Sequence, residues 1–263
     1  MLTSEQLHEF EQTGITQLRG AIAPTAVATM RKALWAELAS AHGVRENDRD
    51  TWRVAGRPSG FQSLAKRGVF GAMASPTVRA ALDDLFGERG WDEPARWGQP
   101  LVCFGQPEDW DVPRDHWHLD FAGDPREPLV AVRVFAFLAP LESHGGATLA
   151  LAGSHRLVRR LCERAGSALR SADAREQLAA LDPWLAALES DEGDGRVVRF
   201  MEAATLVDGV PLRVVEVRGE AGDVALMRTD VLHAMSSNVR DVPRLVVGQF
   251  VTRRGMLRPS EFA

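Results

Sequence analysis

Two short stretches of the chain carry side chains that together could hold a transition-metal ion. In the first, His118 and Asp120 are separated by one residue, so in a strand both side chains point to the same face. The second contains His233, which follows a turn-like Gly-Asp, a short apolar strand and a polar loop. Two imidazoles and one carboxylate form the facial triad that holds ferrous iron for oxygen chemistry, with three coordination positions open. His116 shares the parity of His118 and is the competing ligand.

An arginine in the following segment adds an anion site to this pattern. Arg244 lies eleven positions after His233, beyond Asn, Asp and Pro residues that mark a turn. If a hairpin turns around residues 239–240, Arg244 lies opposite Met235 and on the same face as His233. A guanidinium there suits the two-pronged capture of a carboxylate, and a dicarboxylate held in this way could also chelate the iron.

The elements that must position these residues fall into a helical first part and a strand-rich second part. Capping and spacing signals predict helices at 3–13, 24–41 and 76–86, with a loop region at 43–70. From about residue 97, short apolar or β-branched segments alternate with Gly, Pro and Asp, which is typical of an antiparallel sandwich or barrel. The predicted strands are 99–104, 129–138, 146–151, 212–217, 223–228 and 244–252.

The fold class that we predict is mainly β with helical support, and its core is a double-stranded β-helix (jelly-roll, cupin-like). The motifs follow one another in the order expected of that fold. We expect one domain over 1–263, with a helical N-terminal part at about 1–95 and a β core at about 96–255. A helical insert at about 156–189 interrupts this core.

Composition and charge exclude several classes of protein. With 45% hydrophobic and 25% charged residues, the 263-residue chain is typical of a globular protein rather than a disordered one. A net charge of −5 provides no basic field for nucleic acid or an anionic membrane. Cys103 and Cys162 cannot form a disulfide framework, and the N-terminus lacks the basic and apolar runs of a signal peptide. We expect a cytoplasmic protein with no nucleic-acid or membrane partner.

Taken together, the motifs resemble the phytanoyl-CoA dioxygenase-like family of iron(II)- and 2-oxoglutarate-dependent oxygenases. The resemblance covers most of the chain, and its parts are specific only jointly. The stretches that carry it are LTSEQLHEFEQTGITQLRGAI (2–22), HLD (118–120), SHGGATLALAGSHR (143–156), GDVALMRTDVLHAMSSN (222–238) and DVPRLVVGQFV (241–251).

The resemblance implies a role for each matching residue. It makes His118, Asp120 and His233 the iron(II) ligands, and it makes Arg244 the partner of the distal carboxylate of the cosubstrate 2-oxoglutarate. His155 matches a structural position of the family. The implied reaction consumes O2, hydroxylates an unactivated C–H of a small metabolite or natural-product intermediate, and releases succinate and CO2. Related halogenases replace the carboxylate ligand with a small residue, so an aspartate here favours hydroxylation, desaturation or cyclisation.

Two further residues are candidates for cosubstrate binding. Gln99 lies near a position where the family places a polar contact to 2-oxoglutarate. Arg133 alternates with Phe135 and Phe137, so its side chain points into the barrel, where a buried arginine requires a carboxylate partner. That partner is 2-oxoglutarate, the substrate or a protein acid. One departure from the family is Met235, since relatives often carry Ser or Thr at this position to help the arginine hold the cosubstrate.

Two other functional classes stay open at this point. A cupin-type metalloenzyme that does not use 2-oxoglutarate would bind its metal through His116, His118 and His233, but residues 121–123 lack the Glu that usually follows such a motif. A non-catalytic β-helix protein would bind a ligand without turnover. In the oxygenase, residues 43–70 and 156–189 are expected to line or cover the barrel mouth. The first of these segments offers Trp52, Arg53, Arg57, Phe61 and Gln62.

Overall fold

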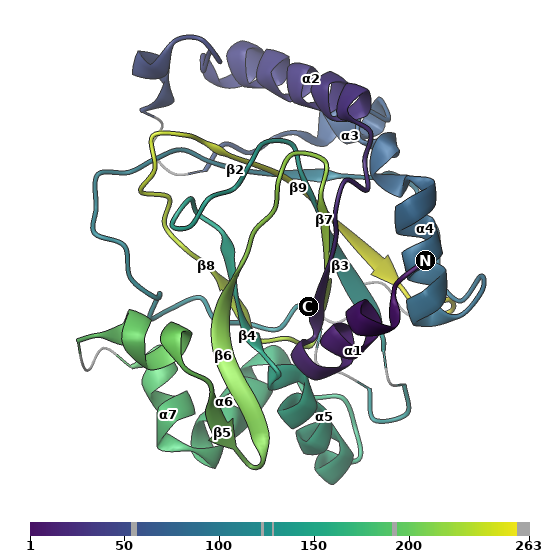
Figure 1. Ribbon diagram of the computed structural model, residues 1–263, viewed down its shortest axis with the longest axis vertical. Helices are drawn as coiled ribbons and strands as arrows, with labels where there is room; N and C mark the ends of the chain where they lie inside the picture. Colours follow the sequence, from purple (N-terminus) through teal and green to yellow (C-terminus); the bar gives the residue numbers. More distant parts are fainter. Residues whose placement is uncertain (54–56, 122–123, 128, 191–193, 257–263) are drawn as a thin grey trace.

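Two antiparallel sheets form the centre of the molecule (Figure 1). The computed structural model describes residues 1–53, 57–121, 124–127, 129–190 and 194–256. The five-stranded sheet has the order β1–β7–β3–β9–β2, and the four-stranded sheet has the order β5–β6–β4–β8. The strands are β1 (Ile15–Leu18), β2 (Gln99–Cys103), β3 (Ala131–Phe137), β4 (Thr148–Ala152), β5 (Thr205–Val207), β6 (Val210–Val217), β7 (Val224–Arg228), β8 (His233–Met235) and β9 (Arg244–Thr252).

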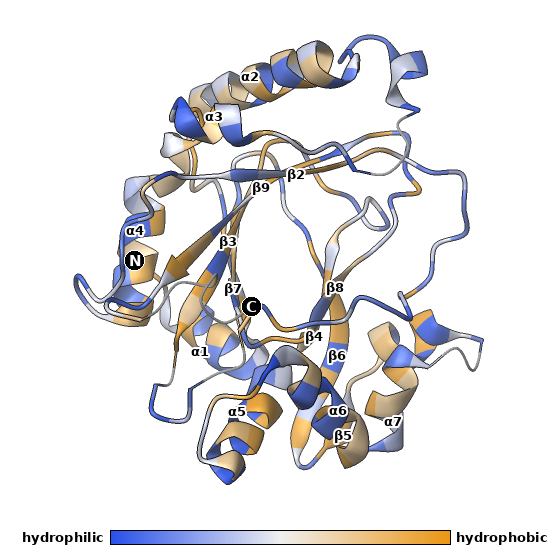
Figure 2. Cartoon of the chain, turned by 180° about the vertical axis from the view of Figure 1, so that it is seen from behind, coloured by the Kyte–Doolittle hydropathy of each residue, from blue (hydrophilic) through white to orange (hydrophobic). Residues whose placement is uncertain are grey.

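Helices cover the outer faces of both sheets. In Figures 1 and 2, α2, α3 and α4 lie on the side of the five-stranded sheet, and α5, α6 and α7 lie on the side of the four-stranded sheet. The helices are α1 (Ser4–Thr13), α2 (Pro24–His42), α3 (Gln62–Lys66), α4 (Pro76–Phe86), α5 (Ser154–Ala165), α6 (Ser171–Leu181) and α7 (Pro183–Ala186). Short 3₁₀ turns lie at Arg49–Trp52, Gly71–Ala74 and Ala187–Glu189, and a π-helical turn lies at Val198–Glu202.

Apolar side chains are buried in three main layers. One joins α2 and α4 to the outer face of β3 and β9, and another joins α5, α6 and α7 to the outer face of β4 and β6. The third lies between the sheets and contains Phe135, Phe137, Met227 and Val246. Because residues two apart share a face of a strand, polar residues in register with this inner layer meet in the space between the sheets.

The helices and strands predicted from the sequence are confirmed. The first helix has Thr3 as its N-cap, in a capping box with Gln6, and ends at Gly14 in the left-handed conformation. The six predicted strands are present as β2, β3, β4, β6, β7 and β9, and their ends differ from the prediction by two residues or fewer. More of the described residues lie in helices than in strands, so the predicted class of mainly β with helical support underestimates the helical content.

Two strands, β1 and β5, were not predicted from the sequence. The strand β1 pairs with β7, so the N-terminal part contributes to the sheet as well as to the helices. The strand β5 has three residues, which is too short for an alternating pattern to be recognised, whereas β8 is the short strand that the sequence analysis places at His233 and Met235. The segment 43–70, expected as a loop region, contains α3 and a 3₁₀ turn within its described residues. No helix in the described ranges combines the length and the apolar character that a membrane span needs.

A buried arginine joins the end of the helical segment to the chain that leads to His118. The side chain of Arg196 is 2% exposed. Its guanidinium donates hydrogen bonds to the backbone carbonyls of Val112, Pro113, Ala187, Leu188 and Ser190. An ion pair with Asp111 at 3.9 Å adds to these contacts. The cation is therefore stabilised mainly by carbonyl dipoles.

Candidate metal centre

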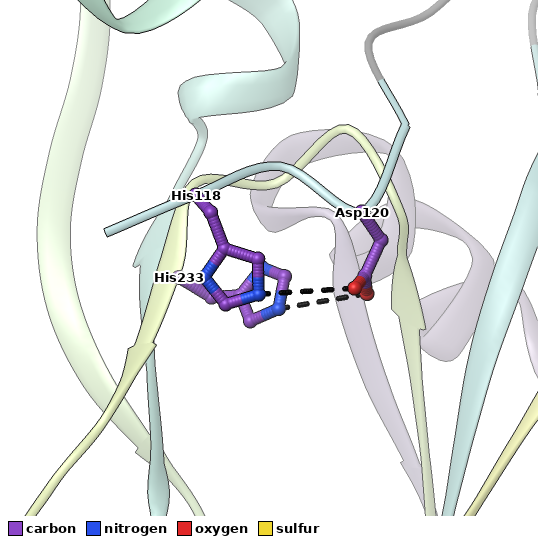
Figure 3. Close-up of side chains that lie close together, drawn as sticks. All are labelled: His118, Asp120 and His233. Atoms are coloured by element: carbon purple, nitrogen blue, oxygen red, sulfur yellow. Dashed lines mark ion pairs between the residues drawn. The ribbon is translucent and has the colours of Figure 1, made fainter. Parts of the chain in front are cut away.

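His118, Asp120 and His233 converge on one point (Figure 3). One ligand atom from each lies within 4.8 Å of the other two. Asp120 Oδ1 is 3.8 Å from His118 Nε2, and Asp120 Oδ2 is 3.5 Å from His233 Nε2. Metal bonds of about 2.1 Å at right angles place two donor atoms roughly 3 Å apart. The cluster is therefore slightly wider than a metal-bound set and has the correct shape for one.

Backbone pairing brings the two histidines together. His118 and His233 exchange N–H···O hydrogen bonds of 2.9 and 3.0 Å, so the segment that carries His118 lies along β8. Phe121 N–H then bonds to the carbonyl of Thr229 at 3.1 Å. The carboxylate of Asp120 is held between these two backbone contacts and faces both imidazoles.

The hydrogen bonds of the two rings leave the metal-facing nitrogens free to accept a metal. His118 Nδ1 lies 2.8 Å from the carbonyl of His116, and His233 Nδ1 lies 2.9 Å from the carbonyl of Val231. A carbonyl only accepts, so each Nδ1 carries the proton and each Nε2 offers its lone pair. Burial lowers the pKa of His233 to about 4, which keeps this ring neutral at neutral pH.

The aspartate completes a donor set that fits a divalent transition metal. Asp120 Oδ2 is buried and has no hydrogen-bond partner within the described chain. A buried carboxylate oxygen without a partner costs free energy, and a metal ion at this point would remove that cost. Two neutral imidazoles and one carboxylate are the ligands of the 2-His-1-carboxylate iron sites.

The other predicted histidines lie outside the cluster. The side chain of His116 is 84% exposed and its ring pairs with Asp115 at 3.2 Å, so only its carbonyl contributes, by holding His118. The ring of His155 is buried at the start of α5, where Nε2–H donates to the carbonyl of Glu11 at 3.2 Å. The cupin-type set that includes His116 is therefore not assembled.

Arg244 is a buried cation in the space between the sheets. Its Nη1 donates to the carbonyl of Gly146 at 2.9 Å, and its Nη2 donates to Thr148 Oγ1 at 3.1 Å. Nε has no partner, and no carboxylate of the described residues lies within ion-pair distance. Burial lowers the pKa of Arg244 to about 10, so the group remains a cation at neutral pH. A buried guanidinium that is charged and has an Nε unpaired within the described chain can bind an anionic ligand.

The hairpin expected between His233 and Arg244 is wrong. The strands β8 and β9 belong to different sheets, because the chain crosses from one sheet to the other between them. Met235 pairs with Thr148 on β4, and Arg244 pairs with Cys103 on β2. Arg244 therefore approaches the interior from the sheet opposite to β8.

Position 235, where relatives often carry Ser or Thr, holds a methionine, and the hydroxyl beside Arg244 comes from a neighbouring strand. Thr148, the cross-strand partner of Met235, supplies the hydroxyl that contacts Arg244. The sequence analysis missed Thr148. Its signal was present in the SHGGATLALAGSHR stretch, but it becomes readable only when the register of β4 and β8 is known.

The two remaining candidates lie in different surroundings. Arg133 points inward from β3 and pairs with Asp120, Nη1 to Oδ1, at 3.6 Å. Asp120 is the protein acid among the three partners considered for this arginine, and Arg133 Nε has no hydrogen-bond partner among the described residues. Gln99 is exposed at the start of β2 and lines a cavity of about 470 Å³.

None of the three residues of the metal cluster lines this cavity, and its link to the cluster is Met235, which shares a face of β8 with His233. Arg57, Phe61 and Gln62 also line it, whereas Trp52 and Arg53 line a separate surface hollow. None of its described lining residues comes from the insert at 156–189, whose helices pack outside the four-stranded sheet.

Comparisons with known proteins give a family and a fold. The family model described as phytanoyl-CoA dioxygenase matches residues 10–246. A search of curated proteins found no match. Among solved structures, HygX from Streptomyces hygroscopicus with nickel and 2-oxoglutarate bound is 17% identical, with a TM-score of 0.55 over 97% of this chain and 89% of that one.

Two other solved structures are similar to the same extent. AviO1 from Streptomyces viridochromogenes Tue57 is 16% identical, with a TM-score of 0.53 over 98% of this chain and 99% of that one. SnoN, a non-heme alpha-ketoglutarate-dependent epimerase from nogalamycin biosynthesis, is 15% identical, with a TM-score of 0.52 over 95% and 81%. At these identities the likeness is evidence of a shared fold.

Proposed function

The chain belongs to the phytanoyl-CoA dioxygenase family, and from this premise we propose that it is an iron(II)- and 2-oxoglutarate-dependent dioxygenase. The observation that carries the proposal is the cluster of His118, Asp120 and His233 in the same interior as a buried Arg244 that has no acid partner among the described residues. The proposed reaction is hydroxylation of an unactivated C–H with release of succinate and CO2. An epimerisation, like that named for the relative SnoN, is the nearest other outcome.

Each residue of the site has a task in this reaction. When bound, iron(II) and 2-oxoglutarate would supply the oxidising chemistry with O2. His118, Asp120 and His233 bind the metal, and the carbonyls of His116 and Val231 orient the two rings. Arg244 binds the distal carboxylate of 2-oxoglutarate, supported by the hydroxyl of Thr148.

The surroundings of the site are apolar on one side and open on the other. Phe135, Phe137, Met227 and Val246 are buried between the sheets, whereas the side chain of His118 is 46% exposed, so solvent and ligands can reach the site from that side. We assign the cavity beside Met235 to a small-molecule substrate, with Arg57 and Gln99 on its walls. HygX has been crystallised with hygromycin B, which supports a small-molecule substrate here.

The fold proposed for this activity is a double-stranded β-helix within one domain over residues 1–263. Two antiparallel sheets with a shared inner layer support it, as does the order of the motifs along the chain. The helices α5 to α7 then form an insert between β4 and β5.

The test is formation of succinate from 2-oxoglutarate by the purified protein with iron(II) and O2, measured without added substrate as slow uncoupled turnover. We expect turnover in the wild type and none in Asp120→Ala. A cupin-type enzyme or a non-catalytic binding protein would form no succinate above the level of free iron. Equal turnover in the wild type and Asp120→Ala would contradict the proposed function.

A further inference from the structure

The ion pair between Arg133 and Asp120 indicates a role for Arg133, a residue that does not itself bind the metal. Arg133 lies on β3, the middle strand of the five-stranded sheet, between Met227 on β7 and Phe250 on β9. Its side chain is 14% exposed, and Nη1 reaches Asp120 Oδ1 at 3.6 Å. A central strand thus presents a cation to the only carboxylate of the cluster.

The guanidinium of Arg133 is enclosed by the Phe250 ring and by the backbone at Gly248. Its carbon lies 4.0 Å from the centre of the Phe250 ring, which covers one side of the group. Across the same sheet, a Cβ on Gly248 would lie 3.3 Å from Nη2 and 3.4 Å from Nε. Glycine weakens the interior of a strand, and here it marks a close approach of another group. The position of Arg133 is therefore restricted from two sides.

The two oxygens of Asp120 are in different electrostatic situations. Oδ1 lies 3.6 Å from Arg133 Nη1 and 3.8 Å from His118 Nε2, whereas Oδ2 is buried, lacks a hydrogen-bond partner among the described residues and lies 3.5 Å from His233 Nε2. If both oxygens bound one metal ion, Oδ1 would have to leave Arg133, or the guanidinium and the metal would share one oxygen. Repulsion between two cations disfavours the second arrangement.

We propose that Arg133 is a positioning residue that restricts Asp120 to one metal bond, through Oδ2. This inference rests on the proposed function for the presence of the metal. A carboxylate that binds through one oxygen leaves three of six octahedral positions open, and 2-oxoglutarate and O2 together need three. A carboxylate that binds through both oxygens leaves two. Arg133 thereby preserves the position on which the cosubstrates depend.

The experiment uses Mn(II) as the probe metal, without cosubstrate. Electron paramagnetic resonance of free Mn(II) gives the metal affinity, and water-proton relaxation gives the number of water molecules bound to the metal. Arg133→Met is the test variant, because it removes the charge and keeps a side chain of similar length beside Phe250. It also leaves Asp120 without its ion-pair partner in the metal-free protein, so its stability is measured alongside. Arg244→Met is the matched control, since it removes another buried arginine from the same interior.

We expect three bound waters in the wild type and two in Arg133→Met, so that the relaxation due to bound water falls by about a third. Mn(II) affinity should rise about threefold to tenfold, because a nearby like charge is lost and Asp120 gains a second bond. The affinity of the Mn(II) protein for 2-oxoglutarate should fall. Arg244→Met should keep three waters and lose only 2-oxoglutarate affinity, and Arg133→Lys should restore three waters.

A second variant keeps the proposal testable if Arg133→Met does not fold. Gly248→Ala leaves the charge in place and displaces the guanidinium by a few tenths of an ångström, so it should shift the water count and the Mn(II) affinity in the same direction by a smaller amount. Unchanged water count and Mn(II) affinity in folded Arg133→Met would overturn the proposal, and so would weaker Mn(II) binding. If His233→Ala binds Mn(II) as the wild type does, the proposed metal site itself is wrong, which is a separate result.

Discussion

His116 and His118 are two residues apart in the chain but differ in what their rings contact. The ring of His116 is exposed, whereas the ring of His118 faces Asp120 and His233. We expect His118→Ala, Asp120→Ala and His233→Ala each to abolish stoichiometric iron(II) binding, and His116→Ala to retain it, since only its carbonyl is used. Anaerobic isothermal titration calorimetry measures this difference. Loss of binding in His116→Ala with retention in Asp120→Ala would favour a cupin-type arrangement.

Arg244 should determine cosubstrate affinity and leave metal affinity unchanged. Losing a buried, hydrogen-bonded charge partner costs about 2–5 kcal/mol, so Arg244→Ala should weaken 2-oxoglutarate binding by roughly 30-fold to several thousand-fold. Arg244→Lys should recover part of the loss, because an ammonium cannot make the two-pronged contact. Titration of the anaerobic iron(II) protein with 2-oxoglutarate, followed by the metal-to-ligand absorption band, measures the affinity. Unaltered affinity in Arg244→Ala would show that another group holds the cosubstrate.

Thr148 offers a milder change at the same place. Thr148→Val removes the hydroxyl that Arg244 contacts and preserves the shape of the side chain. This hydrogen bond is present without cosubstrate and orients the guanidinium, so we expect 2-oxoglutarate affinity to fall by only about tenfold, which is less than in Arg244→Ala. The same absorption titration applies. Ser236→Ala is the control, since its hydroxyl bonds to the carbonyl of Ala147 instead.

At the level of single residues, spacing alone placed His118 and Asp120 together, although they lie outside the strands, with only an isolated bridge at His118, but it could not place groups from different sheets. The two-residue separation of His118 and Asp120 predicted that they face the same point, and they do. The contacts of Arg244 with Thr148, and of Arg133 with Asp120, join residues of different segments through tertiary packing. No local pattern in the sequence encodes which strands lie opposite one another.

Among the elements, the long helices, the long strands and the short strand at His233 were readable, and β1 and β5 were not. Caps and apolar spacing located α1, α2 and α4, because their signals extend over several turns. The crossing between β8 and β9 was misread as a hairpin, since Asn, Asp and Pro predict a turn but not the sheet that receives the next strand.

The junction between α1 and β1 depends on a glycine. Gly14 has a φ of 81°, and a Cβ there would clash with Val231 Cγ2 and lie 2.8 Å from His155 Nδ1. We expect Gly14→Ala to lower the free energy of unfolding by about 2–4 kcal/mol, through backbone strain and overpacking together. Urea denaturation measures the free energy of unfolding of the variant and the wild type. Gly20→Ala is the control for strain alone, because its φ is also positive but no atom lies within 4 Å of its Cβ, so a loss of only about 1 kcal/mol is expected there.

For the whole molecule, two buried histidines make stability depend on pH. Burial lowers the pKa values of His155 and His233 to about 4, from 6.5 in the unfolded chain. Between these values the unfolded chain binds more protons, so the metal-free protein should lose stability as pH falls from 6.5 toward 4. The loss should be about 1.4 kcal/mol per pH unit for each histidine, and it should be absent above pH 7.

The measurement is urea denaturation at several pH values with a chelator present. The charged groups that act on the ring of His155 are Asp230, Arg228 and Arg156, and burial outweighs them. His155→Gln should remove about half of the pH dependence. A profile that is flat between pH 6.5 and 4.5 in the wild type would contradict the assignment of neutral buried rings.

Arg196 closes a long loop without a covalent bond. It lies 84 residues from Val112 along the chain, and its carbonyl contacts hold the two segments together. Unlike a disulfide, these hydrogen bonds break on unfolding, so they stabilise the folded state and do not restrict the unfolded ensemble. His118 follows Pro113 by five residues, so the helical segment cannot detach without releasing the chain that carries this ligand. We therefore expect unfolding of the insert and loss of the metal site to occur as a single cooperative event.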